Sequence, residues 1–190
     1  MIVASILGEL LLGWLLADLM SGFFHWFEDE IAEEDWPVIG PLITVPNRLH
    51  HHKPLVFLES TFVQRNWINT LLSLLVGAGL AVVFGPHLWI AAAVAGGSIV
   101  NEVHAWAHRP KTVPRLVGIL QETGLLQSHR GHAFHHRGEH NSAYCALTNF
   151  LNPILDAVKF WRGVEWMLDR GRRVASSVRE RLRAWPRQYA

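Results

Sequence analysis

Three apolar stretches separated by polar segments set the pattern of this chain of 190 residues. The first runs from about Ile2 to Phe24. No Lys, Arg, Asp or Glu occurs between positions 65 and 102, and this stretch is too long for one span because ~20 residues cross the hydrocarbon core. Gly85-Pro86-His87 interrupts it as a turn between two helices would. We therefore predict three transmembrane helices, the second and third forming a hairpin of about Trp67–Phe84 and Leu88–His108.

The first stretch is interrupted only by Glu9 and Asp18. A cleaved signal peptide is the alternative, but no Lys or Arg precedes the apolar run and the run is too long for the core of a signal peptide. We expect a membrane span, with Glu9 in a structural role.

The remaining segments are more polar. The acidic stretch from Glu28 to Asp35, followed by several prolines, predicts an irregular loop. Val113–Leu126 fits a short surface helix, and Phe150–Leu168 an interfacial helix or a shallow fourth insertion. The Arg-rich segment from Arg170 to Arg187 suits anionic headgroups.

The cations fall on one side of this topology. Arg48, Lys53 and Arg65 lie in the first long loop, and the other fourteen Lys and Arg residues lie from Arg109 onward. Three spans place all seventeen on the same face, which the positive-inside rule makes cytoplasmic.

The net charge is only +1, so we expect no nucleic-acid partner. The single cysteine, Cys145, excludes an internal disulfide.

Eleven of the twelve histidines share that face, and only His87 lies on the other. They come from four separate segments, so they can converge. His104 and His108 lie one helical turn apart, with Asn101 on the same face. If the segment His132–His140 is helical, His132, His136 and His140 align, with His135 beside them. Two interpretations without metal binding remain for these motifs. One is hydrogen-bonded polar residues at a membrane boundary, and the other is a cationic surface patch.

Two further motifs extend the histidine set. His50, His51 and His52 are consecutive, so they cannot all face one ion. Asp18, His25 and Asp29 form a helical stripe, and an acidic residue inside a span is costly and by default suggests function. A hydrogen bond to a neighbouring helix is the competing role for Asp18.

Neutral imidazoles suit zinc, copper, iron or nickel, and a structural zinc needs about four ligands. Nine or ten converging candidates are enough for two ions. No HExxH motif and no Ser/His/Asp elbow is present in the sequence. Many nitrogen ligands at a membrane surface favour a non-haem di-iron centre that activates oxygen.

The chain resembles the plasmanylethanolamine desaturases, relatives of the plant enzymes that place a trans double bond in chloroplast phosphatidylglycerol. The resemblance covers about Asp18 to Glu165. Its blocks are Asp18-x-x-Ser21-Gly22-x-x-His25-Trp26-x-x-Asp29, His50-His51-x-x-Pro54, Asn101-x-x-His104-x-Trp106-x-His108, His132-x-x-His135-His136-x-x-x-His140-x-x-x-Tyr144-Cys145, Leu151-Asn152 and Phe160-Trp161-Arg162-x-x-Glu165.

The resemblance implies a multi-pass membrane enzyme with two histidine-bound iron ions, molecular oxygen as co-substrate and a phospholipid substrate. It also implies a small electron-transfer protein, a b-type cytochrome or a ferredoxin with its reductase. The expected metal ligands are His25, His50, His51, His104, His108, His132, His135, His136 and His140. Asp18, Asp29 and Asn101 are expected to orient them.

The sequence departs from the family pattern at several positions. Ser60 and Gly131 stand where histidines are expected, Ile31 replaces a tryptophan, and His52 and His129 are additional candidate ligands. The activity implied is formation of the vinyl-ether bond of plasmalogens from alkyl-ether phospholipid. An acyl-chain desaturase or hydroxylase on the same centre, a zinc-dependent membrane hydrolase and a non-catalytic metal- or lipid-binding membrane protein remain alternatives.

The predicted fold is an all-α integral membrane protein with about three transmembrane helices and a cytoplasmic, histidine-rich helical cap. We expect residues 1–170 to form a single membrane-embedded domain and residues 171–190 a basic C-terminal tail.

Overall fold

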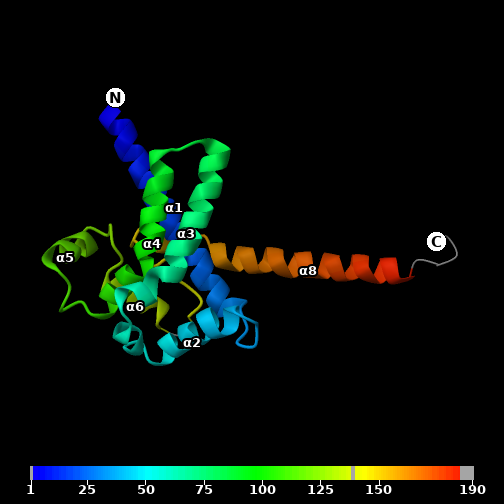
Figure 1. Ribbon diagram of the computed structural model, residues 1–190. Coiled ribbons are helices and arrows are strands. Elements are labelled where there is room, and N and C mark those ends of the chain that lie inside the picture. Colours follow the sequence, from blue (N-terminus) through cyan, green and yellow to red (C-terminus); the bar gives the residue numbers. More distant parts are fainter. Residues whose placement is uncertain (1, 138–139, 185–190) are drawn as a thin grey trace. The chain divides into compact units, whose positions relative to one another are not determined.

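The computed structural model describes residues 2–137 and 140–184, with the side chains of 174–184 excepted, and this part of the chain contains helices and no strand. The last residues of the predicted basic tail, 185–190, lie outside the described residues. In chain order the helices are α1 Ile2–Glu30, the π-helix Gly40–Thr44, α2 Val45–His52, the short helix η2 Val56–Glu59, α3 Phe62–Phe84, α4 Leu88–His108, α5 Arg115–Glu122, α6 His129–His135, α7 Leu151–Ala157 and α8 Phe160–Ala184 (Figure 1). The chain divides into two compact units, residues 1–154 and 155–190.

Three helices are long and apolar enough to cross a membrane, namely α1, α3 and α4. The predicted hairpin is confirmed, since α4 has the predicted bounds and Gly85 ends α3 with a positive φ of 84°. Two bounds differ from the prediction. A capping box of Thr61 and Gln64 starts α3 at Phe62, and α1 continues to Glu30, so the acidic residues Glu28 to Glu30 are helical.

Close contacts between small residues pair α1 with α4 in parallel. A Cβ atom added at Gly13 would lie 2.0 Å from the carbonyl oxygen of Trp89, and one added at Gly96 would lie 2.8 Å from the Cβ of Ala17. At the start of the pair, the Glu9 carboxylate accepts a hydrogen bond from the backbone N–H of Leu88 (3.0 Å). Larger residues in place of Gly13 and Gly96 would push the two helices apart, because their side chains would collide with the facing helix. The parallel pairing brings the carboxyl ends of α1 and α4 together.

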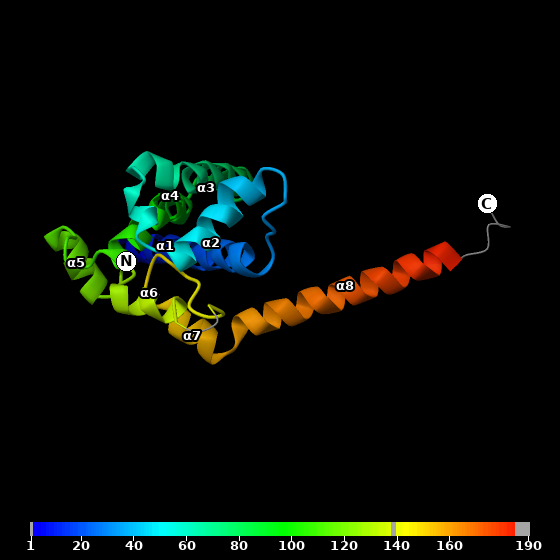
Figure 2. The same ribbon diagram turned by 90° about the horizontal axis from the view of Figure 1, so that it is seen from below.

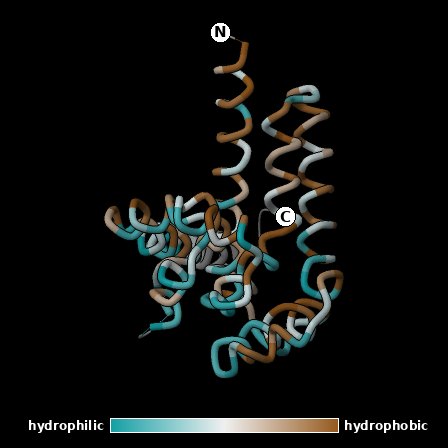
Figure 3. Tube along the Cα trace, turned by 90° about the vertical axis from the view of Figure 1, so that its left-hand side faces the viewer, coloured by the Kyte–Doolittle hydropathy of each residue, from teal (hydrophilic) through white to brown (hydrophobic). Residues whose placement is uncertain are grey.

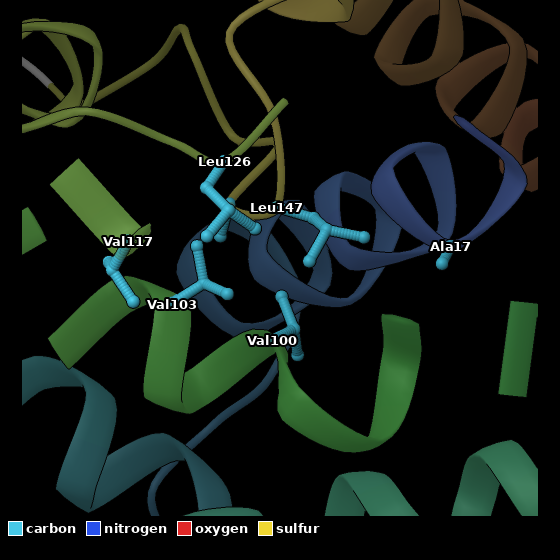
Figure 4. Packing of buried hydrophobic residues seen from close by; sticks show 7 residues of the cluster. Ala17, Val100, Val103, Val117, Leu126 and Leu147 are labelled. Atoms are coloured by element: carbon cyan, nitrogen blue, oxygen red, sulfur yellow. The ribbon is translucent and has the colours of Figure 1, made fainter. Parts of the chain in front are cut away.

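A small apolar core lies where α1 and α4 meet the segments that follow α4. Val100 and Val103 of α4 pack with Val117 of α5, and with Leu126 and Leu147 from the loops on either side of α6 (Figure 4). Val103 and Leu147 are completely buried. This core fixes the last two turns of α4, which carry His104 and His108, against the later part of the chain.

Elsewhere the spans expose their apolar side chains. Val82 is 87% exposed and Leu75 61% exposed, which suits surfaces that face hydrocarbon rather than water. Figure 3 shows hydrophobic residues along the part of the helices near the N-terminus and the hairpin turn, and hydrophilic residues gathering toward the opposite end. The helices α2 and α6 both lie at that polar end (Figures 1 and 2).

The shorter predicted helices are found with different bounds. The expected helix at 113–126 is α5, Arg115–Glu122, and the mixed segment at 150–168 divides into α7 and the first part of α8. The condition for aligning His132, His136 and His140, a helix over 132–140, is not met. α6 ends at His135, and His140 has a φ of 55°, in the left-handed region, so His132, His136 and His140 do not share a helical face.

Candidate metal centre

All the histidines except His87 come from four helices and one loop that meet at the polar end of the spans. His25 lies in the last turns of α1, His50 and His51 in α2, His104 and His108 at the end of α4, and the others in or after α6. Their nitrogen atoms form two main groups. Group A is His50, His104, His108, His132 and His136, and group B is His25, Asp29, His51 and His135; within each group the candidate ligand atoms lie within 4.8 Å of one another.

Group A brings five imidazole Nε2 atoms to one point. The Nε2 atoms of His50, His104 and His108 form a triangle with sides of 2.9, 3.1 and 3.2 Å. The Nε2 of His132 lies 2.9 Å from that of His108, and the Nε2 of His136 lies 3.2 Å from that of His50. Each of the five atoms therefore lies at hydrogen-bond distance from at least one other.

Hydrogen bonds alone cannot satisfy this arrangement. A ring nitrogen has a single in-plane direction, which holds either a proton or a lone pair, so one Nε2 cannot serve two neighbours at once. A shared cation can. With metal–nitrogen bonds of about 2.1 Å, ligands at right angles lie about 3.0 Å apart, whereas tetrahedral ligands lie about 3.4 Å apart. The separations of 2.9–3.2 Å in group A lie close to the range expected for nitrogen ligands that share one ion.

Group B combines three imidazoles with one carboxylate. The two Asp29 oxygens lie 2.9 Å from the Nε2 of His51, 3.4 Å from that of His135 and 3.8 Å from that of His25. The Nε2 atoms of His25 and His135 and the Oδ2 of Asp29 are buried without a hydrogen-bond partner. Buried polar atoms are normally satisfied, so three unsatisfied atoms facing one another are the donor set that a cation would complete.

Consecutive residues divide between the two groups. His50 belongs to group A and His51 to group B, and across the end of α6 His135 belongs to group B and His136 to group A. His51 and His136 form a third set with His140, whose ring centroid lies 4.6 Å from that of His51. The two groups are therefore neighbours in one centre. Both can hold a metal ion.

Backbone carbonyls orient two of the group B imidazoles. The Nδ1 of His25 lies 3.1 Å from the carbonyl oxygen of Tyr144, and the Nδ1 of His135 lies 2.8 Å from that of Ser142. A proton on Nδ1 donated to each carbonyl leaves the lone pair on Nε2, pointing into the group. The loop from Ser142 to Tyr144 thus sets the tautomer that metal binding requires.

Burial keeps the imidazoles outside the spans neutral. Desolvation, reinforced by neighbouring imidazoles, lowers the pKa of His50 to about 2 and the pKa of His136 to about 3. The same causes lower the pKa of His132 well below its usual value. These residues are uncharged at neutral pH, so their lone pairs are free to bind a cation.

Asp18 lies in the membrane-spanning part of α1 and holds the loop after α6. Its Oδ1 accepts hydrogen bonds from the backbone N–H groups of Leu147 and Thr148, both at 2.9 Å, and its Oδ2 accepts one from the Thr148 hydroxyl. Ser21, one turn later, accepts from the N–H of Ala146 (3.0 Å). The Asp18-x-x-Ser21 motif therefore anchors the segment from Tyr144 to Thr148. The carbonyl of Tyr144 in this segment is the one that orients His25.

Asn101 bonds to the protein backbone of a neighbouring helix. Its amide donates to the carbonyl oxygen of Arg65 (2.8 Å), which ties α4 to α3. Asn101 and Asp18 thus support the framework of the centre, whereas Asp29 touches its histidines. The roles of these three residues in catalysis, and of the nine predicted histidine ligands in metal binding, stay predictions.

Sequence reasoning missed a buried ion-pair network beside group A. Arg65 donates from Nε and Nη2 to one oxygen of Glu102 (3.2 and 2.6 Å), and Arg109 donates to the other oxygen (2.9 Å). Arg65 and Glu102 bound the charge-free stretch, and the hairpin places them at the same end. That pairing of two charges across a predicted hairpin was the available signal.

The additional histidines lie outside the groups found among the described residues. His52 is exposed, and His129 places its Nδ1 2.8 Å from the carbonyl oxygen of Ala107. His87 lies in the hairpin turn, as predicted. At Gly131 an added Cβ would lie 2.3 Å from Oδ1 of Asn149, so a side chain there would require the Asn149 amide to move. At the other departure, the Ser60 carbonyl accepts from the Arg65 guanidinium.

Comparison with known proteins identifies relatives over most of the chain. The family model of the lipid desaturase domain matches residues 14–178. The chain is 32% identical over 170 residues to a plasmanylethanolamine desaturase of Myxococcus xanthus, and 29% identical over 165 residues to plasmanylethanolamine desaturase 1 of Mus musculus. It is 34% identical over 162 residues to the chloroplastic fatty acid desaturase 4 of Arabidopsis thaliana.

These alignments cover 86%, 80% and 80% of this chain, but only 60%, 61% and 48% of the respective relatives. The chain therefore spans about half to three fifths of the length of these curated relatives. The comparison with solved structures gave no match.

Proposed function

The chain belongs to the lipid desaturase family, and we propose that it is a membrane-bound, oxygen-dependent desaturase with two iron ions, acting on the alkyl chain of an ether phospholipid. The product would be the vinyl-ether bond of a plasmalogen. The observation that carries this proposal is the pair of neighbouring ligand groups at the polar end of three apolar helices.

The composition of the groups favours iron over zinc. Group A offers five nitrogens, whereas zinc in proteins is almost always four-coordinate when structural and has three protein ligands when catalytic. A zinc-dependent hydrolase would leave part of this ligand set unused.

The reaction balances with an external reductant. Removing two vicinal hydrogens from the alkyl chain supplies two electrons and two protons. Reducing one oxygen molecule to two waters consumes four of each. The other two electrons come from a small electron-transfer protein, a b-type cytochrome or a ferredoxin with its reductase, and two protons come from solvent. Bound iron would supply the oxygen activation that the side chains cannot.

The protein's own residues position the reactants. The histidines of groups A and B supply neutral ligands, and Asp29 adds a negative charge to group B. The backbone carbonyls of Tyr144 and Ser142 hold two imidazoles in one tautomer. Asp18 fixes the loop that carries those carbonyls. We propose that the histidine face and the basic residues are cytoplasmic, following the positive-inside rule.

Acyl-chain desaturation is the second candidate, supported by the 34% identity to a chloroplastic fatty acid desaturase. An alkyl chain and an acyl chain present similar methylene groups to the same centre. The substrate that is consumed distinguishes the two.

The test is to express the full chain in cells that lack plasmalogens, supply an alkyl-ether phospholipid and measure acid-labile vinyl ether by lipid mass spectrometry. We expect the vinyl ether in the presence of oxygen, and none from a His104→Ala variant. New double bonds in acyl chains without vinyl ether would replace the first candidate by the second. Lipids unchanged by the expressed, metal-loaded protein would refute both.

A further inference from the structure

The short helix η2 places an aromatic ring against group A. The Phe57 ring centroid lies 5.2 Å from that of His50, in an edge-on arrangement, and 5.1 Å from that of His104. Phe57 is half-buried, so its ring touches two members of the centre while part of it faces outward. Its position is at the boundary between group A and the surroundings.

The residues around Phe57 present apolar side chains to the outside. Leu55 is 65% exposed, Val56 37% and Phe62 52%. Exposed apolar side chains next to membrane-spanning helices fit a hydrocarbon environment rather than water. Leu55, Val56 and Phe62 therefore form an apolar surface beside group A, interrupted by the exposed Glu59.

That surface continues on α3. A shallow, open groove of about 350 Å³ lies on the surface of this one helix, lined by the apolar Phe62, Val63, Trp67, Leu71 and Leu74 and by the polar Asn66 and Thr70. Because α3 is one of the three helices suited to cross a membrane, the occupant with matching chemistry is a hydrocarbon chain.

Arg65 holds this segment in place. Its guanidinium lies 5.9 Å from the centroid of the Phe57 ring, donates to the Ser60 carbonyl and pairs with Glu102, two residues before His104. The cation over the ring face is attracted by the π electrons, and the buried pair fixes the cation. Residues of α3 and α4 therefore hold the Phe57 ring in place.

We propose that Phe57 is a specificity-determining residue that contacts the lipid chain and sets the width of the passage by which that chain reaches group A. The inference rests on the proposed function for its substrate class. An alkyl or acyl chain lying in the α3 groove would pass the Phe57 ring, and a branched chain would be excluded by it.

The first test measures contact without turnover. A photoreactive benzoyl-phenylalanine replaces Phe57 in the full chain in membranes, and a matched protein carries it at Phe84, which is 58% exposed at the far end of α3. We expect capture of the ether lipid by the Phe57 probe to saturate, and to fall when unlabelled competitor lipid is added before irradiation. The Phe84 probe should capture bulk lipid without saturation. No capture at Phe57, or capture that matches Phe84, overturns the proposal.

The second test measures selectivity. Straight and methyl-branched alkyl lipids are supplied together to Phe57→Ala, Phe57→Trp and the unchanged protein. We expect Phe57→Ala to raise the branched-to-straight product ratio by roughly tenfold, the discrimination that one methyl group gives in an apolar pocket, and Phe57→Trp to lower it. Metal content should be unchanged, because Phe57 is not a ligand.

The role of Phe57 and the proposed function can be refuted independently. Product with an unchanged ratio in both variants refutes the role of Phe57 and leaves the proposed function standing. Saturable capture at Phe57, with no desaturated product from any lipid, refutes the proposed function and leaves the contact standing.

Discussion

The hydrogen bonds of Asp18 give a graded prediction about how α1 supports the centre. Asp18, Leu147 and Thr148 are all completely buried. Asp18→Ala leaves two backbone N–H groups without an acceptor, and an unsatisfied buried donor costs about 1–3 kcal/mol, so the free energy of unfolding should fall by about 2–6 kcal/mol. Asp18→Asn keeps an oxygen for both N–H groups and should cost about 1 kcal/mol. Ser21→Ala removes the acceptor of one N–H group and should lie between them.

The same substitutions should weaken metal binding. The loop that Asp18 anchors supplies the carbonyl that orients His25, and removing outer partners of metal ligands typically costs 10–100-fold in affinity. Thermal unfolding in lipid nanodiscs and metal titration of the purified protein measure the two effects. An Asp18→Ala protein with unchanged stability and unchanged metal affinity would refute this account of the motif.

Three further predictions follow from the centre and its surroundings. His51→Ala should lower the metal content, whereas His52→Ala, at the exposed neighbouring position, should leave it unchanged, as measured by elemental analysis. Burial lowers the pKa of His50 from 6.5 to about 2, so below pH 6.5 the unfolded chain binds more protons and the metal-free protein should lose stability as the pH falls, seen in melting curves at pH 8 and pH 5. Arg65→Met should cost about 3–5 kcal/mol by leaving the buried Glu102 carboxylate without its main partner, and the double variant with Glu102→Leu should be more stable than Arg65→Met alone.

The pattern of the sequence was sufficient for the spans and for gathering the histidines. Gly85 and Pro86 break the long apolar stretch where the helices turn, and the hairpin then returns His104 and His108 to the face that holds His50 and His51. The length of the apolar stretches carried this inference because transmembrane helices have few alternatives in a bilayer.

The partners of buried polar groups could not be predicted in the same way. Asp18 bonds to residues about 130 positions later, and no local pattern indicates that pairing. The end of α6 at His135 also escaped prediction, since four histidines at helical spacing suggest a continuing helix.

The surroundings of Gly131 are visible only in the fold. A side chain there would displace the Asn149 amide, whose Oδ1 accepts a hydrogen bond from the backbone N–H of Ser128 (3.1 Å). The chain thus has a tight helix start at this position instead of another imidazole. Group A reaches five nitrogens without it.

Metal stoichiometry tests the central claim most directly. The full chain, purified anaerobically with iron, should contain about two iron ions per chain by elemental analysis. His132→Ala should remove the ion of group A and His135→Ala that of group B, each leaving about one, since the two residues lie one turn apart on α6 and belong to different groups. A single zinc ion per chain, or equal loss of all metal from both variants and from His52→Ala, would contradict the two-group account.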